Sequence, residues 1–277
     1  MWTKALRDMA RRFGSHNRSW IWGRHVVLET LRAGKWRPLE LLVSPRCAEK
    51  ARHELERLAR LRQVEFTVVT DDQLARRCRS DEHQGLAASL PPFPYARFDE
   101  LLSSTPLLST WLVLDRMHDS FNFGAVLRAA EGLGVKAVVI GSEEQSEVNS
   151  QVVRSSAGAV NYVPIAKVDR LADAVRALRD AGCAVVAASE KAAHPLPRVD
   201  LRGPVAVVIG NEGQGIQPAV WRLCTTVARI PMMGHIGSLN AAVAAGIVCY
   251  EIVRQRSTPN STPPGSAAHS ADDQSTP

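Results

Sequence analysis

The second part of the chain alternates short apolar runs with segments whose apolar residues recur every three or four positions. The runs predict strands near 111–115, 136–140, 163–166, 183–188, 205–209 and 227–230. The segments between them predict helices near 122–134, 169–181, 216–223 and 239–256. This alternation is typical of a largely parallel sheet with helices on both faces. We therefore predict an α/β domain over residues 110–256.

The first part predicts a smaller α/β sandwich over residues 17–90. Its expected elements are a helix at 23–33, a strand at 39–43, a helix at 48–62, a strand at 64–69, a short helix at 71–78 and a strand at 85–90. The run Pro91-Pro92-Phe93-Pro94 should end this domain and begin a linker over 91–109, because proline blocks both helix continuation and strand pairing. We interpret residues 1–16 as a basic extension, and residues 257–277, rich in Ser, Thr and Pro, as a disordered tail.

Positive charge is concentrated in the first part of the chain. Residues 1–100 contain 19 Lys or Arg against 13 Asp or Glu, whereas residues 101–277 contain 15 of each, so the formal net charge of +6 lies wholly in the first part. A basic module joined to a neutral one suits a polyanionic partner such as RNA. The cluster Arg76, Arg77 and Arg79 is a candidate contact, whereas the mixed charges from Glu49 to Arg62 fit a solvated helix face.

Composition narrows the class of protein further. No apolar run is long enough to span a membrane, and we expect no membrane partner. The five cysteines are scattered without pairing or nearby histidine clusters, which predicts neither disulfides nor a metal site. We therefore expect a cytoplasmic protein without a metal. Cys249 is interpreted as a small core residue.

Three segments place polar residues and glycines where predicted strands end and helices begin. The first, from Leu112 to Ala130, carries Asn122 and Arg128. The second, Val205 to Gly215, is an apolar strand followed by Gly-Asn-Glu-Gly-Gln-Gly. The third reads Ile-Pro-Met-Met-Gly-His-Ile-Gly-Ser-Leu-Asn and ends at Asn240. Ligands of parallel α/β sheets bind at the carboxyl ends of the strands, where all three segments fall.

The polar residues of these segments also have structural interpretations. Ser238 and Asn240 could be helix N-caps, Glu212 could offset the dipole of the helix at 216–223, and Arg128 could form a surface salt bridge. Asp115 and Asp119 border the site and are interpreted as loop formers. His25 lies in a first helical turn and could be either a satisfied polar residue or an RNA contact.

Taken together, the segments N-x-G-A-x-x-R, I-G-N-E-G-x-G and I-P-M-x-G-x-x-x-S-L-N resemble the SpoU (TrmH-like) family of SPOUT methyltransferases. The resemblance extends from about residue 20 to about 256, including Ile21 to Leu31 and His83 to Leu86 of a substrate-binding domain. It implies methyl transfer from S-adenosylmethionine to a ribose 2′-hydroxyl of RNA. It also implies a deep trefoil knot, roughly from Val185 to Arg254, although protein chains are in general not knotted. For the first domain it implies a fold like that of ribosomal protein L30e.

The resemblance also implies the roles of individual residues. S-adenosylmethionine would be held by Gly210, Ile230, Met232 and Leu239. The catalytic residues would be Asn122, Arg128, Glu212, Ser238 and Asn240. In the family Arg128 would lie nearest the hydroxyl. Because a guanidinium stays protonated near neutrality, we expect it to grip the adjacent phosphate and stabilise developing oxyanion charge, while a phosphate oxygen or water takes the proton. A base role for Arg128 is the alternative.

Substrate and assembly rest on the same resemblance. The basic first domain is similar to that of members acting on a guanosine of large-subunit ribosomal RNA; a tRNA methyltransferase and a non-catalytic ribosome-associated protein are alternatives. A nicotinamide-binding enzyme does not fit, because the glycine spacing is not G-x-G-x-x-G. Ser120 stands where the family usually has proline, which loosens the first loop. Members are typically homodimers, and the apolar helix 239–256 fits a contact surface or a buried core helix.

Overall fold

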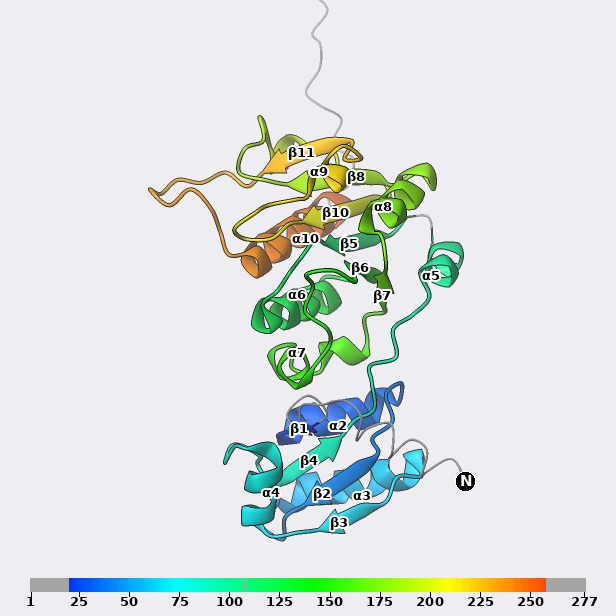
Figure 1. Cartoon of the computed structure of the whole chain (residues 1–277), viewed down its shortest axis with the longest axis vertical. Coiled ribbons are helices and arrows are strands. Elements are labelled where there is room, and N and C mark those ends of the chain that lie inside the picture. Colours follow the sequence, from blue (N-terminus) through cyan, green and yellow to red (C-terminus); the bar gives the residue numbers. More distant parts are fainter. Residues whose placement is uncertain (1–19, 107, 258–277) are drawn as a thin grey trace, which may run out of the picture.

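The computed structural model describes residues 20–106 and 108–257 and shows two β-sheets, each with its own helices (Figure 1). The predicted basic extension and, apart from Ser257, the predicted tail lie outside the described residues. No helix within the described ranges is both long and apolar enough to cross a membrane.

The smaller sheet has four strands in the order β1-β4-β2-β3. They are β1 (Trp20–Trp22), β2 (Glu40–Val43), β3 (Phe66–Val68) and β4 (Leu86–Ser89). Strand β4 is antiparallel to both neighbours, and β2 and β3 are parallel. The helices of this domain are α2 (Arg24–Ala33), α3 (Glu49–Arg62) and α4 (Asp71–Cys78). Helix α4 begins with a full capping box, in which Thr70 and Gln73 each bond the other's backbone N–H.

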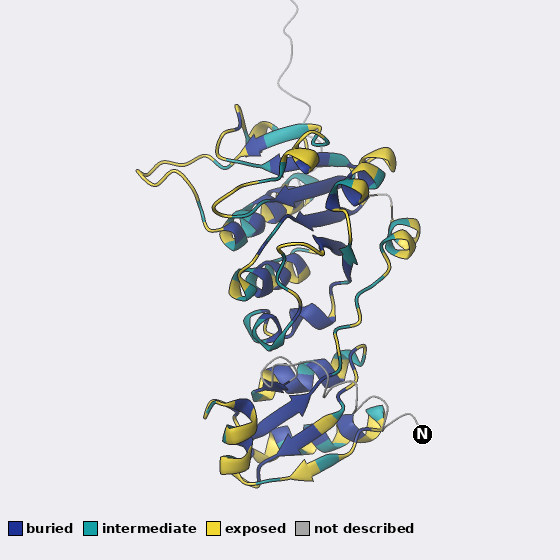
Figure 2. Ribbon diagram, in the orientation of Figure 1, coloured by how far each residue is buried: buried dark blue, intermediate teal, exposed yellow. Residues whose placement is uncertain are grey.

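The larger sheet has seven strands, all parallel, in the order β7-β6-β5-β10-β8-β11-β9. Its strands are β5 (Thr110–Leu114), β6 (Ala137–Gly141), β7 (Ile165–Val168), β8 (Ala184–Ala188), β9 (His194–Pro195), β10 (Val205–Ile209) and β11 (Thr226–Arg229). Every residue of β5, β6 and β10 is buried, as expected for strands covered on both faces (Figure 2).

Helices cover both faces of this sheet and divide its core in two. Helices α6 (Ser120–Gly132) and α10 (Ala241–Ser257) pack on Leu112 and Leu114 of β5. Helix α8 (Leu171–Asp180) and the short α9 (Pro218–Trp221) pack on the opposite face, against Trp111 and Val113. The remaining helices are α5 (Phe98–Ser104) and α7 (Ser150–Ser155), with 3-10 turns at Ala159–Asn161 and Leu196–Arg198. The predicted parallel α/β architecture is thus confirmed.

Several short elements were not predicted. Helix α5 lies inside the expected linker and is only seven residues long, and its apolar residues Phe98, Leu101 and Leu102 pack against the core without being fully buried. Strand β1, helix α7 and strand β9 span only three, six and two residues, too few for a period to be recognised. Their positions are fixed by tertiary contacts rather than by local pattern.

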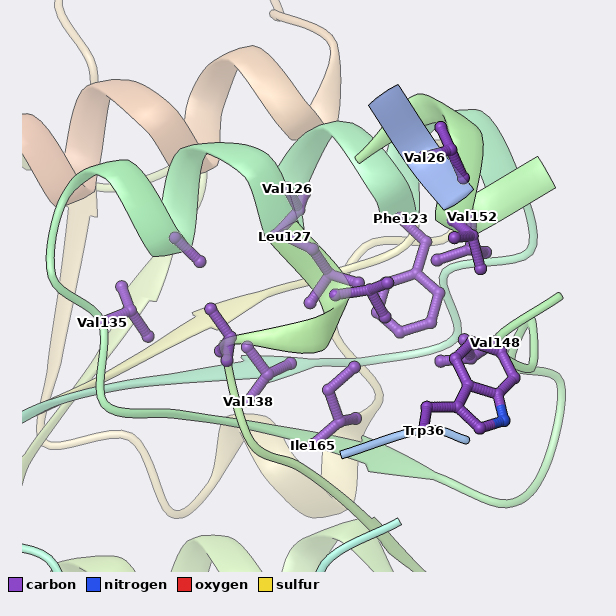
Figure 3. Packing of buried hydrophobic residues seen from close by; sticks show 14 of the residues in the cluster. Val26, Trp36, Phe123, Val126, Leu127, Val135, Val138, Val148, Val152 and Ile165 are labelled. Carbon is purple, nitrogen blue, oxygen red and sulfur yellow. The ribbon is translucent and has the colours of Figure 1, made fainter. Parts of the chain in front are cut away.

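The two domains pack directly on each other through α2 on one side and α7 and its following turn on the other (Figure 1). Val26 and Trp36 of the first domain belong to the same apolar cluster as Val148 and Val152 of the second (Figure 3). The Asn161 amide donates to Thr30 Oγ1 over 3.2 Å within this buried contact. The domains therefore form one continuous packed unit at this interface.

Candidate active site

A cavity of about 680 Å³ opens at the carboxyl ends of β8, β10 and β11. Its walls come from the ends of these strands, the glycine-rich turn after β10 and the loop before α10. All four residues predicted to hold a cofactor line it, and three of the five predicted catalytic residues do so as well. In chain order these lining residues are Gly210, Glu212, Ile230, Met232, Ser238, Leu239 and Asn240.

The turn after β10 folds tightly back on itself at Gly210. A Cβ placed there would lie 2.5 Å from the carbonyl carbon of Gly215 and 2.7 Å from Ile216 Cγ1, so only glycine fits. Asn211 and Gly215 close the turn by exchanging backbone hydrogen bonds of 3.1 and 2.8 Å. Asn211 Oδ1 also accepts from the amides of Gly213 and Gln214 at 2.9 Å each. The turn is therefore preformed, with its shape fixed by its own backbone.

A buried carboxylate anchors this turn to the neighbouring strand. Asp115, fully buried at the end of β5, accepts hydrogen bonds from Gln217 N at 2.6 Å and Gln217 Nε2 at 3.0 Å. Arg116, held at φ 57°, donates to Gln214 Oε1 at 2.7 Å and to the Gly215 carbonyl at 3.3 Å. The interpretation of Asp115 as a simple loop former was wrong, because its partners lie about a hundred residues away in sequence.

Three predicted catalytic side chains, from three separate segments, form one hydrogen-bonded cluster at the edge of the cavity. Asn122 Nδ2 donates to Glu212 Oε1, and Asn122 Oδ1 accepts from Asn240 Nδ2 at 3.0 Å. Asn240 Nδ2 also approaches Glu212 Oε1 at 3.3 Å. Glu212 therefore orients two amides, and in one chain it does not contact Arg128.

Helix starts bring two members of the cluster into place. Asp119 caps α6 by accepting from the Phe121 amide at 2.6 Å, as predicted for a loop-forming aspartate, and this places Asn122 in the first helical turn. Asn240 Oδ1 accepts from the Ala242 and Val243 amides at 2.9 and 3.3 Å. Asn240 thus caps α10 with its oxygen, which confirms the N-cap interpretation, while its nitrogen bonds Asn122.

Arg128 is the predicted site residue that lies apart from this cluster. It is exposed on α6, and it has no hydrogen bond or ion pair with any residue in the described ranges. Six residues along a helix amount to about 9 Å of rise and most of two turns, so Arg128 and Asn122 point in different directions. The next residue, Ala129, faces Gly246 of α10, with its Cβ 3.8 Å from where a Gly246 Cβ would lie.

Helix α10 turns an apolar stripe outward beside Arg128. Its inner face consists of small and medium residues, including Ala245, Val248 and Cys249. Burial raises the pKa of Cys249 to about 12, in keeping with its predicted role as a core residue. On the outer face Val243 and Tyr250 are 50% and 59% exposed. The helix therefore packs into the core through its inner face, as the buried-core interpretation predicted, while part of its outer face stays exposed.

The cavity is lined by backbone together with apolar and polar side chains, and it has a polar rim. Amides and one carboxylate at the rim can hydrogen-bond hydroxyl groups, and the cavity has room for a small molecule. Sequence reasoning missed Arg116, Asn211 and Gln217, which shape the turn. A signal was available for Arg116, since only Asp115 separates it from the end of the buried strand β5.

Comparison with known proteins places these features in a family. The profile of the SpoU rRNA methylase family matches residues 109–250, and that of RNA 2′-O ribose methyltransferase substrate binding matches residues 20–96. A Staphylococcus saprophyticus protein whose name assigns it to the TrmH family of tRNA/rRNA methyltransferases is 33% identical over 239 residues, which are 85% of this chain and 95% of that protein.

Solved structures agree with these matches. An rRNA methyltransferase from Sinorhizobium meliloti with bound AdoMet superposes with a TM-score of 0.75 at 25% identity, covering 91% of this chain and 94% of that one. The SpoU methyltransferase AviRb from Streptomyces viridochromogenes, in complex with AdoMet, gives a TM-score of 0.75 at 25% identity, with 92% and 98% covered. The chain belongs to the SpoU family of RNA methyltransferases.

Proposed function

We propose that this protein transfers a methyl group from S-adenosylmethionine to a ribose 2′-hydroxyl of RNA. The observation that carries the proposal is the cluster of Asn122, Glu212 and Asn240 at the rim of the cavity beside the Gly210 turn. Three segments that are far apart in sequence converge there on side chains suited to hydroxyl groups.

The cavity fits the cofactor that the family uses. Its volume of about 680 Å³ lies within the range of small-molecule sites. Ile230, Met232 and Leu239 offer apolar surface, and Gly210 lets the backbone approach closely. When bound, S-adenosylmethionine supplies the electrophilic methyl group. The residues of the chain then have to hold the ribose, keep water out and accommodate the released proton.

The polar cluster is suited to orient the ribose. Because Glu212 Oε1 already accepts from both amides, the positions of Asn122 and Asn240 are fixed before RNA binds. Ser238, exposed on the cavity wall, presents a hydroxyl to the same region. Placement of reactants in a near-attack geometry can supply several kcal/mol of the barrier reduction, so fixed amides suit this reaction.

Arg128 needs a second copy of the chain to take part. Within one chain it lies apart from the cluster. The next residue, Ala129, lies against Gly246 of α10, whose outer face carries exposed Val243 and Tyr250 and partly buried Ile247. Exposed apolar residues along one helix face are suited to a two-fold contact. We infer a homodimer through this stripe, in which Arg128 of one copy grips the phosphate beside the ribose held by the other.

Complementation between two inactive variants tests this arrangement. Arg128→Ala leaves its own cluster intact, and Asn122→Ala leaves its own arginine intact. Mixed dimers then contain one complete site, so co-refolded mixtures should regain roughly a quarter of wild-type activity. Mixed dimers that stay inactive would show that Arg128 does not act across the contact.

Ribosomal RNA, and within it a guanosine of the large subunit, is the proposed substrate, with tRNA as the alternative. The excess of six positive charges in residues 1–100 supports a separate RNA-binding module. A non-catalytic ribosome-associated protein would retain this basic module without needing the cofactor cavity. We propose that the reaction takes place in the cytoplasm, because the cysteines are free thiols and free thiols suit a reducing compartment.

Two points of fold belong to the same proposal. We infer a trefoil knot between Val185 and Arg254, supported by β10 lying between β5 and β8 in the sheet. We also propose that the first domain is L30e-like and covers residues 17–90, that residues 91–109 form the linker, and that residues 110–256 form the methyltransferase domain.

A methyltransfer assay with isotopically labelled S-adenosylmethionine tests the function. Unmodified transcripts of large-subunit ribosomal RNA and a pool of tRNA are offered in parallel, and the position of label is mapped by resistance of 2′-O-methylated linkages to alkali. We expect label in ribosomal RNA at a single ribose. Label in tRNA alone would select the alternative substrate, and cofactor binding without labelling of either RNA would contradict the proposal.

A further inference from the structure

A second cavity, of about 600 Å³, lies between the two domains and reaches the first turn of α6, the turn that carries Asn122. It is lined by the end of β1, the start of α2, the loop before β4, the first turn of α6 and one face of α7. The lining side chains that matter below are Trp22, His25, Gln84, Phe121, Gln151 and Arg154.

The walls of this interdomain cavity are held in place by contacts between the domains. Tyr162 donates to Glu29 Oε2 at 2.6 Å, and this bond raises the pKa of the tyrosine to about 12. Gly158, at φ +89°, sits so close to α2 that a Cβ there would lie 2.8 Å from Glu29 Cβ. A ligand in the cavity would therefore meet a preformed site that neither domain makes alone.

An exposed aromatic ring connects this cavity to the proposed reaction site. Phe121 is 61% exposed, although no packing requires an aromatic ring in the first turn of α6. It directly precedes Asn122, and neighbouring residues of a helix point about 100° apart. Phe121 therefore serves the interdomain cavity, and Asn122 serves the cavity beside the Gly210 turn. Consecutive bases of a stacked strand are about 3.4 Å apart, so a strand with a ribose at Asn122 can place a nearby base at Phe121.

A stacked arginine forms the opposite wall. The Arg154 guanidinium lies 4.5 Å from the centroid of the Trp22 ring and donates to Glu82 Oε2 at 3.1 Å. This holds its plane in a fixed orientation with donors still available. Arginine planes and aromatic rings are the groups on which proteins stack unpaired RNA bases.

The remaining walls carry hydrogen-bonding groups without partners in the described parts of the chain. Gln84 Oε1 accepts from the Arg24 amide at 3.0 Å, but Gln84 Nε2 bonds to none of these residues. The same holds for the ring nitrogens of His25 and the side-chain amide of Gln151. Donors and acceptors of this kind match the edges of a nucleobase.

We propose that the interdomain cavity binds an unpaired nucleobase of the RNA substrate, stacked on Phe121 and next to the nucleotide whose ribose is methylated. This rests on the proposed function for the identity of the reacting nucleotide, but not for the existence of the base site. In this arrangement the first domain helps to position the RNA substrate, in addition to attracting it by charge.

The test compares binding of short single-stranded RNA oligonucleotides and of abasic oligonucleotides with the same number of phosphates, by fluorescence anisotropy. Phe121→Ala should weaken binding of the base-bearing probe by about 5- to 150-fold, the range of one lost stacking contact, and leave the abasic probe unaffected. Phe121→Trp keeps an aromatic plane and should retain binding. Leu61→Ala removes an apolar side chain that is also 61% exposed, on α3 outside the cavity, and serves as the matched control.

Calorimetry with S-adenosylmethionine keeps this inference separate from the proposed function. Unchanged cofactor affinity in Phe121→Ala, together with weaker binding of the base-bearing probe, is the expected result. Equal binding of abasic and base-bearing probes by the wild-type protein, or equal binding by Phe121→Ala and wild type, would overturn the base site even if methyl transfer is observed. Failure of the wild-type protein to bind S-adenosylmethionine would instead count against the proposed function.

Discussion

Substitution of Gly210 by alanine is the sharpest test of the cofactor cavity. The new Cβ would lie 2.5 Å from the Gly215 carbonyl carbon and 2.7 Å from its oxygen. Nonbonded heavy atoms rest about 3.5–4.0 Å apart, so the two backbone segments must separate by about 1 Å. Both atoms belong to the backbone, and no side-chain rotation can relieve the overlap.

That separation breaks the two hydrogen bonds that close the turn between Asn211 and Gly215, now 3.1 and 2.8 Å long. Each such bond contributes about 0.5–1.5 kcal/mol net, so the preformed turn loses about 1–3 kcal/mol. If this loss appears in cofactor binding, the Kd for S-adenosylmethionine rises roughly 5- to 150-fold.

Isothermal titration calorimetry with S-adenosylmethionine measures this change, and thermal unfolding monitors the fold. Gly203→Ala is the matched control, because a Cβ there meets no atom within 4 Å. We expect the control to bind like wild type. A Gly210→Ala protein with unchanged cofactor affinity would refute the assignment of this turn to the cofactor site.

Three further predictions concern the cluster, the dimer and pH. Asn122→Ala should lower kcat about 100-fold with unchanged affinity for S-adenosylmethionine, measured by single-turnover methylation and calorimetry, because it removes positioning alone. Tyr250→Glu, placed on the outward stripe of α10, should shift sedimentation from dimer to monomer while the unfolding temperature of the subunit stays similar. The bidentate bond from Arg254 and a bond from Gln255 lower the pKa of Glu251 below its ordinary value of 4.5. A lowered carboxyl pKa stabilises the fold above about pH 4.5 and loses this contribution as pH falls, so wild type should exceed Glu251→Gln in denaturant stability near neutrality and converge with it in acid. A difference that persists at low pH would contradict this reasoning.

Periodicity predicted the larger elements of this fold closely because their burial is regular. Strand β10 was expected at 205–209 and spans Val205–Ile209, and helix α8 was expected at 169–181 and spans Leu171–Asp180. The apolar pattern of each element stops at residues that do not continue it, so the limits of both elements can be seen in the sequence. Helix α5 shows the converse, since it spans only seven residues and its apolar residues Phe98, Leu101 and Leu102 are only partly buried.

The outward stripe of α10 marks what periodicity leaves open. Val243, Ile247 and Tyr250 have the spacing of a packed face, yet Val243 and Tyr250 are exposed and Ile247 is only partly buried, whereas Ala245, Val248 and Cys249 are buried. Both faces are apolar, so the sequence pattern does not distinguish the side of the helix that is buried from the side that is exposed. Small residues on the inner face allow close approach to α6, where Gly246 and Ala129 meet.

The structure brings together three of the five residues that the motifs pointed to, but their geometry was not predictable. Motif resemblance identified Asn122, Glu212 and Asn240, whose mutual bonds span 28 to 118 residues of sequence. It did not reveal that Asp115 ties the end of β5 to Gln217, because a buried aspartate and a loop aspartate look alike in sequence. Such pairings depend on which strands are neighbours, and here β5 and β10 are adjacent although β6 to β9 intervene in the chain.

Asn240 links the loop from Met232 to Leu239, which lines the cavity, to the cluster of Asn122 and Glu212. Its oxygen holds the first amides of α10, and its nitrogen holds Asn122 and Glu212. Any shift of the loop from Met232 to Leu239 that moves the start of α10 must therefore also move the amide that positions Asn122. Because Met232 and Leu239 line the cavity, cofactor binding should order this loop and tighten the cluster in one step. The helix cap and the contact with the cluster are coupled, because the oxygen and the nitrogen of one side-chain amide form them.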